Sequence, residues 1–163
     1  TGSVPDMSDD LPDSVTTDLR DDSVIAMTTV DATPAEVFDF LRQPANHSII
    51  SGDGSVTGAT SGPDRLSMGD RFGMSMKIVL PYRMRNTVVE YEQDRRIAWC
   101  HPGKHRWRWE LEPDGEGRTK LTETFDMSTA VFPPALRLLG YPKRHLPNVA
   151  RSVANVRDHF ARR

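Results

Sequence analysis

The C-terminal segment Pro147 to Arg163 is the feature that most constrains how this chain can fold. Its apolar residues recur at steps of four, three and four, at Val149, Val153, Val156 and Phe160. This spacing places them on one stripe of an α-helix, and the proline that begins the segment fits a first helical turn. A helix with one apolar stripe needs an apolar surface to cover, and the strand-like sequence upstream predicts that this surface is a sheet.

The upstream sequence alternates apolar and polar residues over several short runs, as half-buried strands do. A helix interrupts this pattern early, because Thr33 is a favourable N-cap, Pro34 suits the first helical position and Pro44 ends the segment. Further helical turns are expected at 46–50 and 135–139. The expected strands are 23–32, 55–59, 71–78, 82–92, 96–101, 105–112 and 119–127.

This order of elements predicts an α+β fold. One strand is followed by two short helices, then by about six strands in antiparallel succession and by the C-terminal helix, so the sheet has about six or seven strands in all. Consecutive strands joined by tight turns form an antiparallel meander. A strongly bent sheet of this kind, closed over by one long helix, encloses a volume that side chains do not necessarily fill.

The first 22 residues are expected to lie outside the folded domain. Residues 1–6 look like the remnant of an expression tag, and residues 7–22 are acidic, poor in apolar groups and without periodicity. A chain of 163 residues is long enough for one domain with a substantial core. We therefore expect a flexible tail at 1–22 and a single domain at 23–163.

Composition limits the classes of function and the location. A formal net charge of −2 argues against a general nucleic-acid binder, and a single cysteine, Cys100, excludes an internal disulfide and a cysteine-based zinc site. No run reaches the roughly 18 apolar residues of a membrane span, and no signal peptide is visible. We expect a soluble, cytoplasmic monomer or homodimer. The basic residues after Arg137 leave transient contact with an anionic membrane open.

Several segments together resemble a known family, the START-like or Bet v 1-like superfamily (SRPBCC), which includes polyketide cyclases, dehydrases and lipid transport proteins. The resemblance covers residues 23–161 and is carried by VDATPAEVFDFLRQPAN, GDRFGMSM, NTVVEYEQDRRIAW, WRWELEPDGEGRTKLTETFD and the closing helix. It implies a helix-grip fold with a hydrophobic cavity between the sheet and the C-terminal helix. It further implies a small hydrophobic ligand, such as a lipid or polyketide, and no cofactor. A minority of members catalyse cyclisation, dehydration or hydrolysis.

The candidate ligand-binding residues are apolar, aromatic or flexible side chains on the expected inner faces. Ligand pockets have mostly apolar walls with a few orienting polar groups, and methionine adapts readily to ligand shape. Each of these side chains could equally be ordinary core, because alternation predicts burial and not a cavity. The set is Phe72, Met74, Met76, Tyr82, Met84, Arg85, Trp99, Trp107, Trp109, Phe125, Val149, Val153 and Val156.

Glu123 is the candidate catalytic residue. It lies between Leu121 and Phe125 on the expected inward face of the last strand, where desolvation raises the pKa of a carboxyl group and makes it a proton donor or acceptor. The alternatives are a structural carboxylate paired with Arg83, Arg85 or a neighbouring hydroxyl, or a solvent-exposed carboxylate if the strand face is assigned wrongly.

Other catalytic and metal-binding motifs are missing from the sequence. No pair of histidines has metal-ligand spacing on a helix, and there is no Gly-x-Ser-x-Gly elbow and no phosphate-binding loop. His101 and His105 flank a Pro-Gly turn and are expected to face solvent. The sequence predicts no metal and no cofactor.

Three functions remain open from the sequence. The first is a binding protein for a hydrophobic or amphipathic molecule, with access controlled by loops 51–70 and 130–147. The second is an aromatase/cyclase-type enzyme that uses Glu123 with Arg83 or Arg85. The third is a stress or interaction protein with an inert cavity. Several ionisable groups converging on the cavity would favour the enzyme, and a solid core would leave only the third.

Overall fold

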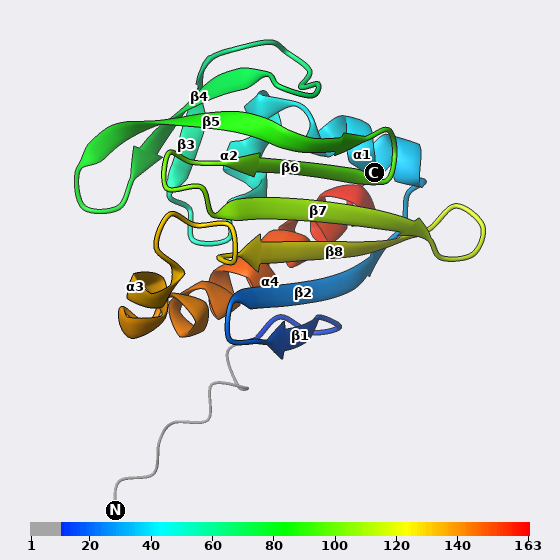
Figure 1. Ribbon diagram of the computed structural model, residues 1–163. Coiled ribbons are helices and arrows are strands. Elements are labelled where there is room, and N and C mark those ends of the chain that lie inside the picture. The colour runs from blue at the N-terminus through cyan, green and yellow to red at the C-terminus, as the bar shows by residue number, and fades with distance from the viewer. Residues whose placement is uncertain (1–10) are drawn as a thin grey trace, which may run out of the picture.

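The computed structural model describes residues 11–163, which form one antiparallel sheet of eight strands with helices packed against it (Figure 1). In chain order the strands are β1 (Thr16–Leu19), β2 (Ser23–Val30), β3 (Val56–Ser61), β4 (Arg71–Lys77), β5 (Pro81–Glu92), β6 (Arg96–Cys100), β7 (Arg106–Pro113) and β8 (Thr119–Asp126). The helical segments are α1 (Pro34–Leu41), the 3-10 turn η2 (Pro44–Asn46), α2 (His47–Ile50), α3 (Pro133–Leu138) and α4 (Tyr141–Ala161). The predicted α+β helix-grip fold is confirmed, with eight strands where six or seven were expected.

The spatial order of the strands is β1-β2-β8-β7-β6-β5-β4-β3. Strands β3 to β8 follow one another as antiparallel neighbours, as the tight turns predicted. The segment α1–η2–α2 carries the chain from β2 to the opposite edge, which leaves β2 free to pair with β8. Helix α4 packs against β2 and β8 and covers the inner face of the sheet.

The additional strand, β1, lies within the stretch expected to be a flexible tail. Residues 16–19 pair antiparallel with β2, with Thr16 opposite Met27 and Leu19 opposite Val24. Residues 1–10 lie outside the described part of the chain. A short polar strand at a sheet edge is held in the sheet by backbone hydrogen bonds to the neighbouring strand. It does not need to bury one face, so its sequence shows no apolar periodicity. For this reason the sequence pattern did not predict it.

Helix α1 begins as the sequence predicted. The Thr33 hydroxyl accepts a hydrogen bond from the Glu36 backbone N–H at 3.3 Å, and the Glu36 carboxylate accepts one from the Thr33 backbone N–H at 2.9 Å. This reciprocal capping box satisfies backbone donors that have no partner within the helix. The apolar side of α1, with Val37, Phe38 and Leu41, is fully buried.

Helix α4 carries the predicted apolar stripe but begins earlier than expected. Its buried side chains include Val149, Val153, Val156 and Phe160. The helix starts at Tyr141, directly after a glycine in the left-handed conformation that separates it from α3, and Pro147 lies inside it rather than in its first turn. A proline costs a helix one backbone hydrogen bond, so the sequence pattern favoured a start at that residue. Packing against the sheet overrides this local preference.

The β4–β5 hairpin extends well past β6 in the sheet. Pairing between β5 and β6 begins at Thr87 and Cys100, so the first six residues of β5 pair only with β4. At about 3.3 Å per residue, this overhang is about 20 Å long. The strand β4 ends at Lys77, and Ile78 is exposed in the turn rather than on the inner face with Phe72, as the alternation predicted.

Candidate functional site

A pocket of about 100 Å³ lies between the sheet and α4. Its walls come from α2 and the loop after it, from strands β3 to β8, and from the first half of α4. Nine of its sixteen lining residues are polar or ionisable, although apolar atoms form most of the pocket surface. This composition matters because polar groups without partners inside a pocket determine what can bind there.

Six of the sequence-predicted site residues meet at this pocket. They are brought together by strand pairing: Trp99 lies opposite Trp107 in the β6–β7 ladder, and Trp109 lies opposite Glu123 in the β7–β8 ladder. Alternation along each strand then directs these side chains to the inner face. The six are Met74, Met76, Trp99, Trp107, Trp109 and Glu123.

Five further predicted residues belong to the apolar core and do not line the pocket. Val149, Val153 and Val156 are fully buried where α4 meets the sheet. Phe72 contacts Trp99 edge-on, with ring centroids 5.8 Å apart, and Phe125 packs against Trp107 at 4.4 Å. These side chains belong to the core, and the two phenylalanines pack against tryptophans that line the pocket.

The remaining three predicted residues are not at the pocket. Tyr82, Met84 and Arg85 lie on the overhanging part of β5, where Arg85 is exposed and Tyr82 is 36% exposed. Arg83 is exposed as well, so neither arginine pairs with Glu123. For Tyr82 and Met84 the sequence prediction failed because alternation reports the face of a strand but not whether neighbouring strands extend far enough to enclose it. Arg85 lies on the outer face, because it alternates with Asn86, which lines the pocket.

Glu123 is buried in the pocket wall with a side-chain oxygen that lacks a partner. The residue is 3% exposed, and its Oε2 has no hydrogen bond within the described part of the chain. Burial raises the pKa of Glu123 well above its ordinary value, and a hydrogen bond with Ser152 opposes the shift. The inward orientation predicted from alternation is thus what the structure shows. The carboxyl group is neutral over a wider pH range than an exposed one and can donate a proton.

Trp109 supplies a second polar atom without a partner at the same place. Its indole Nε1–H, which can only donate, has no acceptor among residues 11–163. The side chain is 1% exposed, lines the pocket and lies directly across the ladder from Glu123. Buried polar atoms in folded proteins normally have partners, so two unsatisfied atoms on paired residues call for an explanation.

A hydrogen-bonded relay of three side chains forms another part of the wall. The Trp107 Nε1–H donates to His101 Nε2 at 3.2 Å, and His101 Nδ1 contacts the Asn86 side-chain oxygen. Since indole can only donate, His101 must accept at Nε2 and carry its proton on Nδ1. Burial, with minor contributions from His105 and His145, lowers the pKa of His101 to about 4, which agrees with a neutral ring. His101 was expected to face solvent, and that prediction was wrong.

His47 is a second neutral histidine in the pocket wall. Its Nε2 lies 2.8 Å from the Leu41 carbonyl oxygen, which can only accept, so the proton is on Nε2 and Nδ1 is an acceptor. The ring is 5% exposed and stacks on Trp99 with centroids 4.6 Å apart. Burial lowers the pKa of His47 to about 4, against the smaller effect of the Leu41 carbonyl.

Sequence reasoning missed His47, Asn86 and His101 for a common reason. Each is a polar residue with polar or turn-forming neighbours, and such residues are usually surface positions. One signal was present for Asn86, which shares the inner face of β5 with the buried Val88. The other two depend on which distant elements cover them.

The loop between α2 and β3 closes the pocket beside α4. A side chain at Gly52 is impossible without rearrangement, because a Cβ there would lie 2.0 Å from the Asn148 carbonyl oxygen. The loop also provides Ser51, Asp53 and Ser55 to the pocket wall, and the hydroxyl of the first hydrogen-bonds the carboxylate of the second at 3.2 Å. Within residues 11–163 there is no group of three side chains suited to hold a metal ion.

Chemically, the pocket combines a carboxyl group with a raised pKa, two neutral imidazoles and three indole rings. It can hold an apolar or aromatic body against the indoles and offer hydrogen bonds at Glu123 and Trp109.

Comparison with known proteins gives two kinds of match. Residues 22–161 match the family described as polyketide cyclase / dehydrase and lipid transport. The uncharacterized protein Rv0088 of Mycobacterium tuberculosis is 33% identical over 138 residues, which cover 82% of this chain and 62% of that protein. This chain therefore spans less than two thirds of the length of the curated relatives it matches.

Solved structures from several bacteria share the fold. A protein from Arthrobacter aurescens has a TM-score of 0.68 at 13% identity, covering 92% of this chain and 93% of its own. Protein NE0264 from Nitrosomonas europaea has a TM-score of 0.66 at 13% identity, covering 87% of this chain and 96% of its own. At these identities the likeness is one of fold alone.

Proposed function

Because the chain belongs to the polyketide cyclase / dehydrase and lipid transport family, we propose that its pocket binds a small amphipathic molecule with an apolar or aromatic body and one polar group. The observation that carries this proposal is that two atoms in the pocket wall, Glu123 Oε2 and Trp109 Nε1, lack partners on residues that face each other across the β7–β8 ladder. A ligand oxygen could accept from the indole while a ligand donor or acceptor meets the carboxyl group. Leaving both groups unpaired costs free energy that a bound ligand would recover.

The size of the pocket restricts the ligand. Pockets that enclose drug-sized ligands span about 300–1,000 Å³, and this one measures about 100 Å³. It accommodates a compact molecule or the polar head of a longer one. A longer body would leave past half-exposed wall residues such as Met76 and Asn148, beside the loop that contains Gly52.

Native mass spectrometry of the purified protein, followed by denaturing extraction, tests this proposal. We expect a co-purified molecule, or binding of a panel of aromatic and amphipathic compounds followed by tryptophan fluorescence. Replacing Glu123 by Gln or Trp109 by Phe should weaken binding about tenfold, the value of one buried hydrogen bond. Glu110→Gln, on the outer face of the sheet, is the matched control and should leave binding unchanged. An empty protein with unresponsive fluorescence would instead favour an interaction protein with an inert cavity.

A second candidate is an aromatase/cyclase-type enzyme, and the ionisable groups in the pocket favour it. Glu123 can donate a proton to a ligand carbonyl, and His47 Nδ1 is an acceptor in the same wall. Incubation with a linear poly-β-ketone and detection of cyclised or dehydrated product by mass spectrometry tests it. Loss of a general acid lowers rates by about 10²- to 10⁴-fold, so Glu123→Gln should abolish turnover while Glu110→Gln retains it. Binding without turnover would leave only the carrier function.

A further inference from the structure

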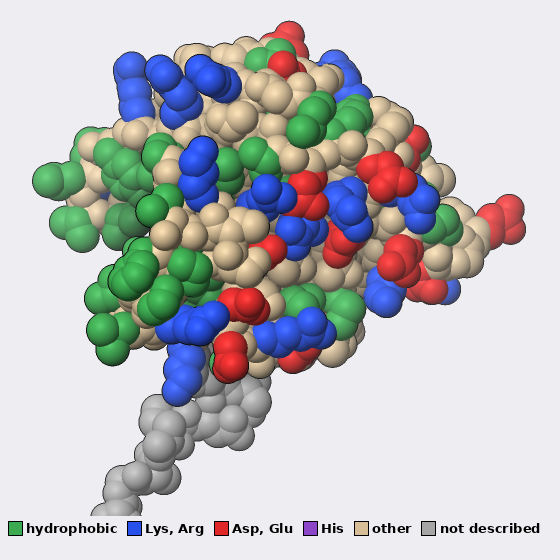
Figure 2. Space-filling view, viewed as in Figure 1, with side chains coloured by type: hydrophobic (Ala, Val, Ile, Leu, Met, Phe, Trp, Pro, Cys, Tyr) green, Lys and Arg blue, Asp and Glu red, His purple; other side chains and the backbone are tan. Residues whose placement is uncertain are grey.

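Large apolar side chains are exposed at one end of the sheet. In the β4–β5 turn, Val79 is 84% exposed, and the flanking Ile78 and Leu80 are exposed too. On α3, Leu138 is 90% exposed, and Phe132 just before the helix is also exposed. Figure 2 shows both groups as apolar side chains on the side of the molecule where Figure 1 places this hairpin and α3.

Strand pairing brings three segments to this end, although they are far apart in the sequence. Cys100 at the end of β6 lies opposite Arg106 at the start of β7, which lies opposite Asp126 at the end of β8. The Val131 backbone N–H donates to the Gly103 carbonyl at 3.0 Å, which attaches the segment before α3 to the β6–β7 turn. We call residues 77–85, 101–105 and 128–148 the apolar end.

The apolar end carries positive charge only. It contains seven lysines and arginines and no aspartate or glutamate, in a chain whose net charge is −2. Within residues 11–163, none of the seven forms an ion pair. The seven are Lys77, Arg83, Arg85, Lys104, Arg137, Lys143 and Arg144.

The opposite end of the sheet has a different surface. Its β5–β6 and β7–β8 turns contain carboxylates as well as cations, for example Glu92 beside Arg95, which lie 3.2 Å apart. They also lack large exposed apolar side chains.

The β1–β2 turn with Asp21 and Asp22 lies at the same end as the apolar end, because Ser23 pairs with Asp126 and the Met127 backbone N–H donates to the Asp22 carbonyl at 2.8 Å. It lies at the β1 edge of the sheet, so a negatively charged partner would approach through the β4–β5 turn and α3 instead.

We propose that the apolar end docks on the surface of an anionic phospholipid bilayer. The apolar side chains project from the tip of a long hairpin and from a short helix, a shape suited to insertion among lipid head groups. The flanking unpaired cations match a negatively charged leaflet, where each contributes about a fivefold gain in affinity. No helix between residues 11 and 163 is long and apolar enough to span a membrane, so the contact is peripheral.

Flotation of the full chain with phospholipid vesicles tests this inference. We expect binding to vesicles of phosphatidylcholine mixed with phosphatidylglycerol, weak or no binding to phosphatidylcholine alone, and release by high salt. Arg83→Glu with Arg85→Glu should weaken binding at least about 25-fold, from two cations at about fivefold each. Val79→Ser with Leu138→Ser should weaken it about tenfold through loss of apolar insertion.

The matched control is Arg95→Glu with Arg118→Glu, which makes the same charge change on turns at the opposite end and should leave vesicle binding unchanged. All substituted side chains are exposed, so far-UV circular dichroism and the melting temperature should match the parent protein. Equal binding to neutral and anionic vesicles, or equal weakening by the control pair, would overturn the proposal. So would self-association that the Val79 and Leu138 changes abolish without any vesicle binding.

This inference is independent of the proposed function, because it concerns the outer surface and not the pocket. Glu123→Gln and Trp109→Phe should lower ligand binding and leave vesicle binding intact. The arginine and apolar-tip variants should do the reverse, so failure of one proposal can be told apart from failure of the other.

Discussion

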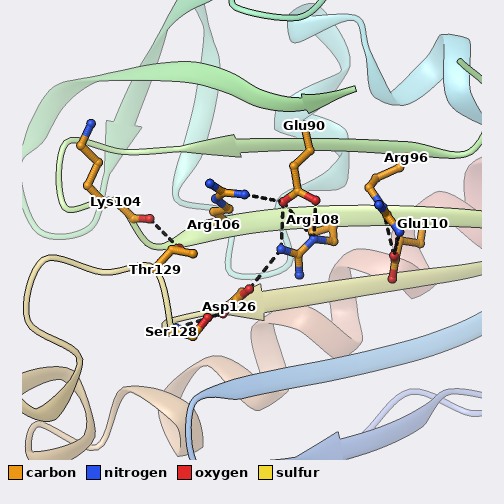
Figure 3. A network of polar contacts seen from close by, with 9 residues as sticks. All are labelled: Glu90, Arg96, Lys104, Arg106, Arg108, Glu110, Asp126, Ser128 and Thr129. Carbon is orange, nitrogen blue, oxygen red and sulfur yellow. Dashed lines mark hydrogen bonds and ion pairs between the residues drawn. The ribbon is translucent and has the colours of Figure 1, made fainter. Parts of the chain in front are cut away.

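A glutamate on the outer face of the sheet and a glutamate on its inner face have opposite surroundings. On the outer face, Glu90 accepts hydrogen bonds from Arg106 at 3.0 Å and from Arg108 at 2.8 Å, and Arg108 also reaches Asp126 at 3.0 Å (Figure 3). On the inner face, Glu123 has no cation beside it and one oxygen without a partner.

The pKa values of the two glutamates diverge accordingly. Burial pushes the pKa of Glu90 upward, but the hydrogen bonds and charges of Arg108 and Arg106 outweigh it and leave the pKa below its ordinary value. Burial raises the pKa of Glu123, and Ser152 offsets little of the shift. The difference teaches that partners, rather than residue type, decide whether a carboxyl group is part of the scaffold or is available to a ligand.

The largest expected effect is a difference in the pH range over which groups on the two faces of the sheet change the stability of the fold. A histidine whose pKa is lowered in the folded state takes up a proton more readily in the unfolded state. The free energy of unfolding is therefore highest above about pH 6.5 and falls as the pH is lowered towards 4. For His47 the loss is about 3 kcal/mol, from the fall in its pKa to about 4. Urea unfolding between pH 7 and 4 should show this decline. His47→Gln, which keeps a donor for the Leu41 carbonyl, should make the decline less steep, while the part due to His101 remains. The outer carboxylates of Glu90 and Asp126 have lowered pKa values, so the stability that they contribute is lost only as pH falls below about 4.5. An equally steep decline in His47→Gln would contradict the assignment.

The next test removes the cation that two outer carboxylates share. Arg108→Ala leaves Glu90 and Asp126 facing each other in a partly buried setting, and should lower the free energy of unfolding by about 2 kcal/mol. Arg96→Ala breaks the more exposed pair with Glu110 and should cost less than about 1 kcal/mol. Chemical denaturation at pH 7 measures both. Equal effects would show that the outer network is merely a set of independent surface pairs.

Replacing the inner carboxyl group of Glu123 by a neutral amide should raise the free energy of unfolding, whereas removing Arg108 lowers it. A carboxyl group whose folded pKa is raised loses stability as pH rises from its unfolded value of 4.5 to its folded value. Glu123→Gln cannot ionise, so it should become more stable than the parent with rising pH, by about 1 kcal/mol per pH unit over that window. Unfolding at pH 5 and pH 8 gives the difference. A constant difference between the two proteins would mean that Glu123 is not shifted.

The smallest effect concerns the relay on the inner face. Trp107→Phe removes the donor to His101 Nε2 and should cost about 1 kcal/mol or less in stability. With Nε2 free to take a proton, the pKa of His101 should rise modestly above about 4, because the lost donor stabilised the neutral ring while burial, the main cause of the shift, remains. NMR titration of the histidine ring protons follows this change, and Trp109→Phe is the matched control. A His101 pKa that stays near 4 in Trp107→Phe would show that burial alone holds it there.

Much of the fold followed from local patterns in the sequence. The apolar stripe of α4 and the alternation of β7 required buried inner faces, and Thr33 with Glu36 fixed the start of α1. Alternation also directed Glu123 inward, because a strand that buries Leu121 and Phe125 must bury the residue between them on the same face. These features need only the period of a strand or helix and the chemistry of a cap.

Only the tertiary structure decided how those side chains are partnered. Asn86, His101 and Trp107 come from different elements, and their relay depends on strand register that no local pattern encodes. The overhang of β5 leaves Tyr82 away from the pocket, because β6 ends before it and not because of the sequence of β5. A sequence specifies which faces are buried through short-range periodicity. Which charges find a partner depends on contacts between residues distant in the chain, and these exist only once the sheet has assembled.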